Sequence, residues 1–306
     1  MASREYRARQ QFIHEVLLVR RLGLLVFLLV VVSFAWVAAA FAAFPGGNGR
    51  VVFVKNGGSG APLFSVNPDG SGLRKITRGH YDSRPSVAPD GRTIAFARDA
   101  RKTRAIFTVR MSGKHLQRLT SDDGSEPAFS GPLGRRIAFT RFNSATSQIW
   151  VMASDGTDER RLTDPRTADR FPAFSPDGKS IAFVRDRGAE QIFKMRSDGS
   201  DVRRLTNGKQ SAGPPSFSPD RESIVFHVLS KKGNWVIYLM TANGAHLQRL
   251  RAGEDPAFSP DGERIIFVRH ERVIYTMNRR GHDLRRVSPR SWSASDPDWA
   301  PRAGNG

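Results

Sequence analysis

The sequence has no cysteine among its 306 residues. Disulfides, thiolate metal sites and cysteine nucleophiles are therefore excluded. Carboxylates are also scarce, because 29 acidic residues stand against 48 lysines and arginines and give a formal net charge of +19. This charge favours anionic partners in general, such as phosphate, an acidic polymer or an anionic membrane surface.

Catalytic motifs are missing as well. Neither Gly-x-Ser-x-Gly nor His-Glu-x-x-His occurs, and the seven histidines are scattered along the chain. We therefore expect no catalytic residue, no metal site and no cofactor. No segment after residue 45 shows a helical period over 11 residues, which points to an all-β domain.

The one long apolar run lies near the N-terminus. Leu22 to Phe44 is 23 residues without a charge, enough to span about 30 Å of hydrocarbon as a helix. Arg20 and Arg21 precede it, so residues 1–21 form a basic leader that is expected in the cytoplasm, with residues 45–306 outside. The alternative is a cleaved signal peptide, for which Ala38-Ala39-Ala40 is a plausible cleavage site; it would release the domain.

A repeat organises the rest of the chain. The string PAFSPDGKSIAFVR begins at Pro172, and PAFSPDGERIIFVR begins at Pro256. Successive copies are 42, 45, 43, 41 and 41 residues apart, and they start at Pro85, Pro127, Pro172, Pro215, Pro256 and Pro297. A period near 43 residues is typical of propeller blades.

Each repeat predicts four short strands, A to D. Strand A is Pro-x-Phe-Ser, and Pro-Asp-Gly forms a tight turn to strand B, which reads Ile-Ala-Phe. Strand C is Ile-aromatic-x-Met, and a second turn such as Asp198-Gly199 leads to the basic strand D. Four antiparallel strands per repeat make a propeller blade.

The two ends of the repeat region predict a closed ring. The repeats start at a strand B, Arg50 to Lys55, and finish with a lone strand A around Trp299. Pairing of these two strands would complete a sixth blade and remove the exposed edges of an open sheet. We therefore expect a six-bladed β-propeller, cut at one A–B turn and preceded by one transmembrane helix.

The repeat resembles that of the TolB β-propeller family. The pattern is clearest as Asp169, Pro172, Phe174, Ser175, Pro176, Asp177, Gly178, Ile181 and Phe183, and the resemblance covers residues 50–301. It implies the fold, and similar repeats occur in envelope scaffolds, in propellers attached to serine peptidases and in some sugar lyases. TolB itself carries an α/β domain before its propeller, whereas here Pro45 to Gly49 leave no room for one.

A set of cations marks the end of strand B. It comprises Lys55, Arg98, Arg141, Arg185 and Arg269. One hypothesis is a basic collar that grips an anionic ligand or acidic peptide near the mouth. The other is structural pairing with the acids that precede strand A, which are Asp82, Glu126, Asp169, Asp255 and Asp296. The repeat that holds Val228 and Gly213 lacks both charges, which favours pairing.

The B–C and D–A loops share one face of the predicted ring and are longer and more variable than the turns on the other face. Binding usually occurs on such loops, and the aromatic residues expected there are Tyr81, Phe171, Trp235 and Trp292. Strand D adds a basic outer belt, which is read either as a solvated edge or as a contact for acidic lipid or wall polymer.

These observations favour a non-catalytic, membrane-anchored scaffold outside the cytoplasm that binds an envelope protein or peptide. Binding of an anionic polymer or lipid through the basic surfaces is one alternative. A propeller hydrolase or lyase with a site at the central mouth is another. Nucleic acid is not expected as a partner of an exported domain.

Overall fold

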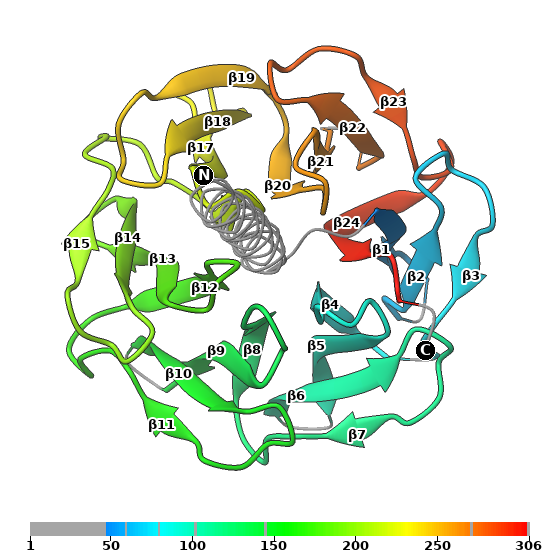
Figure 1. The fold of residues 1–306 in the computed structure, drawn as a ribbon, viewed down its shortest axis with the longest axis horizontal. Coiled ribbons are helices and arrows are strands. Elements are labelled where there is room, and N and C mark those ends of the chain that lie inside the picture. The colour runs from blue at the N-terminus through cyan, green and yellow to red at the C-terminus, as the bar shows by residue number, and fades with distance from the viewer. Residues whose placement is uncertain are drawn as a thin grey trace, which may run out of the picture. The chain divides into compact units, whose positions relative to one another are not determined.

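The computed structural model describes residues 47–304, apart from 59, 79, 101–102, 144–145 and 270–271. They form six four-stranded antiparallel sheets arranged as blades around a central axis (Figure 1). The described residues contain no helix, and so none that could cross a membrane. The predicted transmembrane segment, Leu22 to Phe44, lies outside the described residues.

The strands follow one order in every blade, with strand A innermost and strand D outermost (Figure 1). Blade 1 contains β24 (Ser293–Pro301), β1 (Asn48–Asn56), β2 (Leu63–Val66) and β3 (Arg74–Lys75). Blade 2 contains β4 (Asp82–Val87), β5 (Thr93–Ala100), β6 (Thr103–Arg110) and β7 (Gln117–Arg118). Blade 3 contains β8 (Gly124–Phe129), β9 (Arg136–Phe142), β10 (Ser147–Ala153) and β11 (Arg160–Arg161).

The remaining three blades repeat this order. Blade 4 contains β12 (Asp169–Phe174), β13 (Ser180–Asp186), β14 (Glu190–Arg196) and β15 (Arg203–Arg204). Blade 5 contains β16 (Ser216–Phe217), β17 (Ser223–Leu229), β18 (Trp235–Thr241) and β19 (Gln248–Ala252). Blade 6 contains β20 (Glu254–Phe258), β21 (Arg264–Val268), β22 (Ile274–Asn278) and β23 (Arg285–Arg286).

The ring closes as the sequence predicts. In blade 1, β24 pairs antiparallel with β1, so that Val51 stands opposite Trp299 and Val52 opposite Asp298. The indole Nε1 of Trp299 also donates a hydrogen bond to the Gly49 carbonyl at 3.2 Å. The sixth sheet therefore joins the two ends of the repeat region, and the predicted count of six blades is confirmed.

The A–B turns owe their shape to the Pro-Asp-Gly sequence. In blade 4, the Asp177 carboxylate accepts hydrogen bonds from the Ser175 hydroxyl at 2.6 Å and the Lys179 amide at 3.1 Å. Gly178 has a φ of +68°, and a Cβ there would lie 2.4 Å from the Gly131 carbonyl of the neighbouring turn. Glycine is therefore required both by the backbone conformation and by the close approach of blade 3.

The core lies between the blades. The phenylalanine of each strand B is fully or almost fully buried, and these residues are Phe53, Phe96, Phe139, Phe183, Phe226 and Phe267. Each apolar cluster combines two neighbouring blades; Ile149 of blade 3, for example, packs with Phe183 of blade 4. Val51 of blade 1 shares a cluster with Ile266 of blade 6. Because each blade hides its apolar face only against its neighbours, stability depends on the complete ring.

A bulge divides strand A, and the sequence pattern did not predict it. In blade 4, the pairing of β12 with β13 shifts between Arg170 and Ala173. The residue directly before the proline has a left-handed φ between 48° and 56° in five blades: Arg84, Glu126, Phe171, Asp255 and Asp296. The bulge turns this residue away from strand B, whereas the residue three positions before the proline stays paired with strand B.

Candidate functional site

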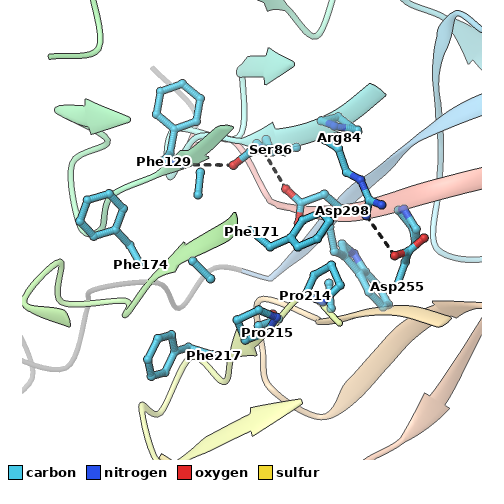
Figure 2. A pocket seen from close by; sticks show the side chains of 18 of the residues that line it. Arg84, Ser86, Phe129, Phe171, Phe174, Pro214, Pro215, Phe217, Asp255 and Asp298 are labelled. Carbon is cyan, nitrogen blue, oxygen red and sulfur yellow. Dashed lines mark hydrogen bonds and ion pairs between the residues drawn. The ribbon is translucent and has the colours of Figure 1, made fainter. Parts of the chain in front are cut away.

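The innermost strands surround a central channel of about 240 Å³. Residues of all six A strands line it, and Figure 2 shows their side chains around the cavity. At one end lie the residues that directly precede the repeat prolines. We call these six the mouth ring, and they are Arg84, Glu126, Phe171, Pro214, Asp255 and Asp296.

Arg84 extends across the mouth and joins several blades. Its Nη1 lies 3.0 Å from Asp255 Oδ1 of blade 6 and 3.1 Å from Asp296 Oδ1 of blade 1. Its guanidinium lies 5.0 Å from the centre of the Phe171 ring of blade 4. Burial opposes the charge of Arg84, but Asp296 and Asp255 outweigh it and raise the pKa of this residue. Arg84 therefore stays charged and ties blade 2 to three other blades.

The carboxylates of the mouth ring lie in different environments. Burial raises the pKa of Glu126, although Thr140 Oγ1 donates a hydrogen bond to it at 2.6 Å and the Phe171 amide donates another at 2.9 Å. Burial also raises the pKa of Asp296, against the opposing effect of Arg84. The pKa of Asp255 is lowered instead, because Arg84 and His227 together outweigh its burial. Three carboxylates around one guanidinium give the mouth a negative balance on a strongly basic protein.

His227 is a buried residue that contacts the backbone of the mouth ring. It lies on β17, and its Nδ1 accepts a hydrogen bond from the Asp255 amide at 2.8 Å. A Cβ at position 213 would lie 1.8 Å from its Nε2, so Gly213 provides the space for the imidazole. Burial lowers the pKa of His227 to about 4. The neutral imidazole therefore acts as a hydrogen-bond acceptor that positions Asp255.

Acidification is expected to destabilise the propeller through His227. An unfolded histidine has a pKa near 6.5, so between pH 6.5 and 4 the unfolded chain binds the extra proton. The contribution of His227 to the free energy of unfolding is therefore fully present above about pH 6.5 and is lost as the pH falls. The loss between pH 7 and pH 4 is about 3 kcal/mol. Urea denaturation at both pH values measures this loss.

The matched control for this experiment is His227→Asn. An asparagine keeps an acceptor oxygen for the Asp255 amide but does not ionise. The free energy of unfolding of this variant should therefore fall by about 3 kcal/mol less than that of the natural protein over the same pH range. Equal losses in the two proteins would show that His227 contributes nothing to the pH dependence.

Below the mouth ring, the side chain that follows each repeat proline can bridge two blades. Ser86 Oγ accepts a hydrogen bond from the Phe129 amide at 3.2 Å, and Asp298 Oδ2 accepts one from the Val87 amide at 2.7 Å (Figure 2). Burial raises the pKa of Asp298, and the hydrogen bond from Val87 opposes this shift. These contacts hold neighbouring A strands in register along the channel.

The five cations of the predicted collar all lie at the end of strand B, in different surroundings. Arg98 and Arg185 are buried, and each forms a two-pronged ion pair, with Asp82 and Asp169 respectively. Arg141 pairs with Asp122 at 2.9 Å and with Glu159 at 2.6 Å. Lys55 Nζ lies 4.4 Å from the centre of the Trp292 ring, and Arg269 lies 5.2 Å from that of Tyr275. A role of this collar in ligand binding stays a prediction.

Ion pairing with the cation of strand B, the alternative hypothesis, is confirmed for Asp82 and Asp169. Asp255 and Asp296 form ion pairs with Arg84 of another blade instead. Asp82 and Asp169 precede their prolines by three residues and lie directly opposite the arginines of strand B. Glu126, Asp255 and Asp296 precede their prolines by one residue, and the bulge directs them to the channel instead. The number of residues to the proline is the sequence signal that separates the two groups.

The four aromatic residues predicted on the loop face differ in exposure. They are Tyr81, Phe171, Trp235 and Trp292. Tyr81 is 56% exposed, whereas Trp235 packs on His227 with ring centres 4.4 Å apart. Trp292 packs edge-to-face on Phe64 at 4.9 Å. Phe171 belongs to the mouth ring. Tyr81 is thus the most exposed of the four, and Phe171 is the one that lines the channel. A role of these aromatic residues in binding stays a prediction.

Sequence reasoning missed three residues of the site: Arg84, His227 and Asp298. Each departs from the repeat at its position. Most other blades carry a small or apolar residue where His227 and Asp298 stand, and three of the other five carry an acid where Arg84 stands. Arg84 is the one cation of the mouth ring, and Asp298 is the one acid that directly follows a repeat proline. A comparison of the six repeats column by column would have found all three.

The closed ring of six four-stranded blades defines a six-bladed β-propeller. The family described as TolB beta propeller domain matches residues 124–301, more than half of the chain. The chain belongs to this family. A comparison with curated protein sequences finds no match.

Solved structures show the same fold. The chain is similar to TolB from Acinetobacter baumannii, with 23% identity, a TM-score of 0.76, and coverage of 87% of this chain and 70% of that chain. It is also similar to the putative TolB from Agrobacterium tumefaciens, with 24% identity, a TM-score of 0.62, and coverage of 69% and 83%. The oligogalacturonate lyase from Vibrio parahaemolyticus shares 11% identity, with a TM-score of 0.54 and coverage of 79% and 75%. At these identities the likeness shows the fold alone.

Proposed function

We propose that this protein is an extracytoplasmic scaffold that binds an envelope protein or peptide at the mouth of its propeller, without catalysis. Membership of the TolB propeller family supports a scaffold role in the cell envelope. In this proposal Leu22 to Phe44 hold the propeller at the membrane, with residues 1–21 in the cytoplasm. If the apolar segment is instead a cleaved signal, the same propeller works as a secreted protein.

The observation that carries the proposal is the Arg84 network at the mouth. The Arg84 side chain is 32% exposed, and its guanidinium lies between two largely buried carboxylates, Asp255 and Asp296, and over the ring of Phe171. Arginine and aromatic side chains contribute most of the energy at protein interfaces. The network fixes these groups on rigid strands of four blades, so a partner meets a surface that is already ordered.

The charge of the mouth indicates what a partner brings. Within the mouth ring, the three acids Glu126, Asp255 and Asp296 outnumber Arg84, so the mouth attracts a basic segment more than an acidic one. A lysine or arginine of the partner would share the carboxylates with Arg84, and an apolar residue would pack on Phe171 and Tyr81. A protein or peptide with mixed basic and apolar side chains therefore suits this surface.

Cross-linking from membranes tests the proposal. The natural protein and a Tyr81→Ala, Phe171→Ala variant are cross-linked mildly in the producing cells, purified and compared by quantitative mass spectrometry. We expect the variant to recover the cross-linked partner at least tenfold less well, because interface aromatic residues contribute about 1.4 kcal/mol or more each. Circular dichroism confirms that both proteins are folded.

The matched control removes exposed apolar side chains away from the mouth. Leu116 and Leu133 are 50% and 67% exposed. Leu116 lies at a C–D turn and Leu133 at an A–B turn, on the face opposite the long loops. Leu116→Ala, Leu133→Ala should leave recovery unchanged. The proposal is wrong if the control loses as much partner as the mouth variant, or if the mouth variant loses none.

A further inference from the structure

The outermost strand of every blade carries a cation at the same register position. The second residue of strand D stands directly opposite the aromatic residue of strand C, as Arg204 does opposite Phe193 and Arg286 opposite Tyr275. We call these six residues the rim cations, and they are Lys75, Arg118, Arg161, Arg204, Arg249 and Arg286. All six are exposed.

Within the described part of the chain, none of the six rim cations lies within ion-pair distance of a carboxylate. Arg118 and Arg204 instead donate hydrogen bonds to backbone carbonyls, at 2.7 Å and 2.6 Å. The neighbouring first position of strand D adds four more arginines, of which Arg203 and Arg285 pair with acids: Arg74, Arg160, Arg203 and Arg285.

Protection of an exposed edge does not account for this pattern. Charges of either sign keep edge strands from pairing with other chains, yet the two central positions of strand D hold ten cations and no acid over the six blades. Like charges gathered in this way repel one another, so the arrangement costs stability unless an anion is bound. Arginine at five of the six rim positions also suits two-pronged contacts to phosphate.

The positions of the rim cations around the ring indicate which shape of anion can contact all of them. Strands β3, β7, β11, β15, β19 and β23 lie all the way round the outside of the ring (Figure 1). A flat anionic surface placed against the edge could reach the strands of one arc only. A flexible linear polymer can follow the rim from blade to blade and meet all six cations.

We propose that the rim binds a flexible polyanion whose charges are phosphates, wrapped around the outer strands. This site is separate from the mouth, where the carboxylates of the mouth ring repel anions, so it does not depend on the proposed function. The attraction comes from the release of counterions by the polymer, and it weakens as salt is added.

Binding of long-chain inorganic polyphosphate to the full-length protein in a non-ionic detergent tests the proposal. The rim variant replaces all six rim cations by glutamine. We expect its affinity to fall more than tenfold at low salt, and the plot of log K against log salt to become shallower by about 4, at roughly 0.7 for each lost phosphate contact. Circular dichroism establishes that the variant is folded.

The matched control removes six exposed cations from turns and loops: Arg78, Lys179, Arg187, Lys209, Lys232 and Arg290. It changes the net charge by the same amount and should bind nearly as well as the natural protein. If the control loses as much affinity as the rim variant, the attraction is general and the proposal is overturned. Absence of binding by the natural protein overturns it as well.

Two further measurements on the natural protein do not depend on the variants. Long-chain polyphosphate should bind at least tenfold more tightly per phosphate than triphosphate, because only a long chain reaches several blades. Vesicles of anionic phospholipid should bind less well than the polymer at equal phosphate concentration. Tight binding to vesicles without binding to the polymer would replace the polymer by a lipid surface and refute the proposal.

Discussion

Trp299→Ala is expected to lower the free energy of unfolding by about 4 kcal/mol. Trp299 is 4% exposed and lies on β24, the strand that closes the ring against β1. Its indole packs with Val51 and Ile266, and so joins blade 1 to blade 6. Truncation would leave a cavity at the closure and remove the hydrogen bond to Gly49. Urea denaturation followed by circular dichroism measures the change.

Trp292→Ala is the matched control for this prediction. Trp292 packs against the same apolar cluster but is only partly buried. Its truncation removes less buried area and should cost clearly less than that of Trp299. If the two variants lose the same free energy of unfolding, the deeper burial of Trp299 adds nothing to stability, and the prediction is wrong.

The second large effect is expected for Asp169→Ala. Asp169 is fully buried and pairs with Arg185, with Oδ1 2.6 Å from Nε and Oδ2 2.9 Å from Nη2. The substitution leaves a buried guanidinium without its counterion, which should lower the free energy of unfolding by about 3–5 kcal/mol. Chemical denaturation measures this loss.

Two controls separate the unpaired charge from the loss of an ion pair as such. Asp169→Leu, Arg185→Met removes both charges and should recover most of the stability lost in Asp169→Ala. Asp164→Ala breaks an ion pair with Arg166 on the surface, and it should leave the stability nearly unchanged. A double variant as unstable as Asp169→Ala would argue that the pair itself, rather than the isolated charge, stabilises blade 4.

The repeats predicted most of the fold. A proline, a Pro-Asp-Gly turn and a buried phenylalanine recur in step, and each of these features has a local physical cause that can be read from neighbouring residues. Gly178 and Phe183 show this most clearly, because the turn and the core position follow from five or six consecutive residues. Closure was also predictable, since the N-terminal end of the repeat region holds strands B, C and D without a strand A, and the C-terminal end holds a lone strand A that completes this sheet.

The candidate site was less predictable because it depends on a bulge. Period-two alternation assigns Asp82 and Asp255 to equivalent roles, whereas the shift in register places Asp82 against Arg98 and Asp255 in the channel. Arg84 crosses the channel to blades that are more than 170 positions away in the sequence. These contacts between distant blades form because the ring closes, so a pattern of neighbouring residues cannot predict them.

The β1–β24 pairing also sets the order in which the ring can form. Every other A strand meets its B strand across a short turn, but Trp299 and Gly49 are 250 positions apart. Bringing such distant segments together costs about 3 kcal/mol more in chain entropy than closing a hairpin of about ten residues. We therefore expect the pairing of β1 with β24 to form last during folding. Until it forms, the edge of β1 stays open, and aggregation competes with folding in that interval.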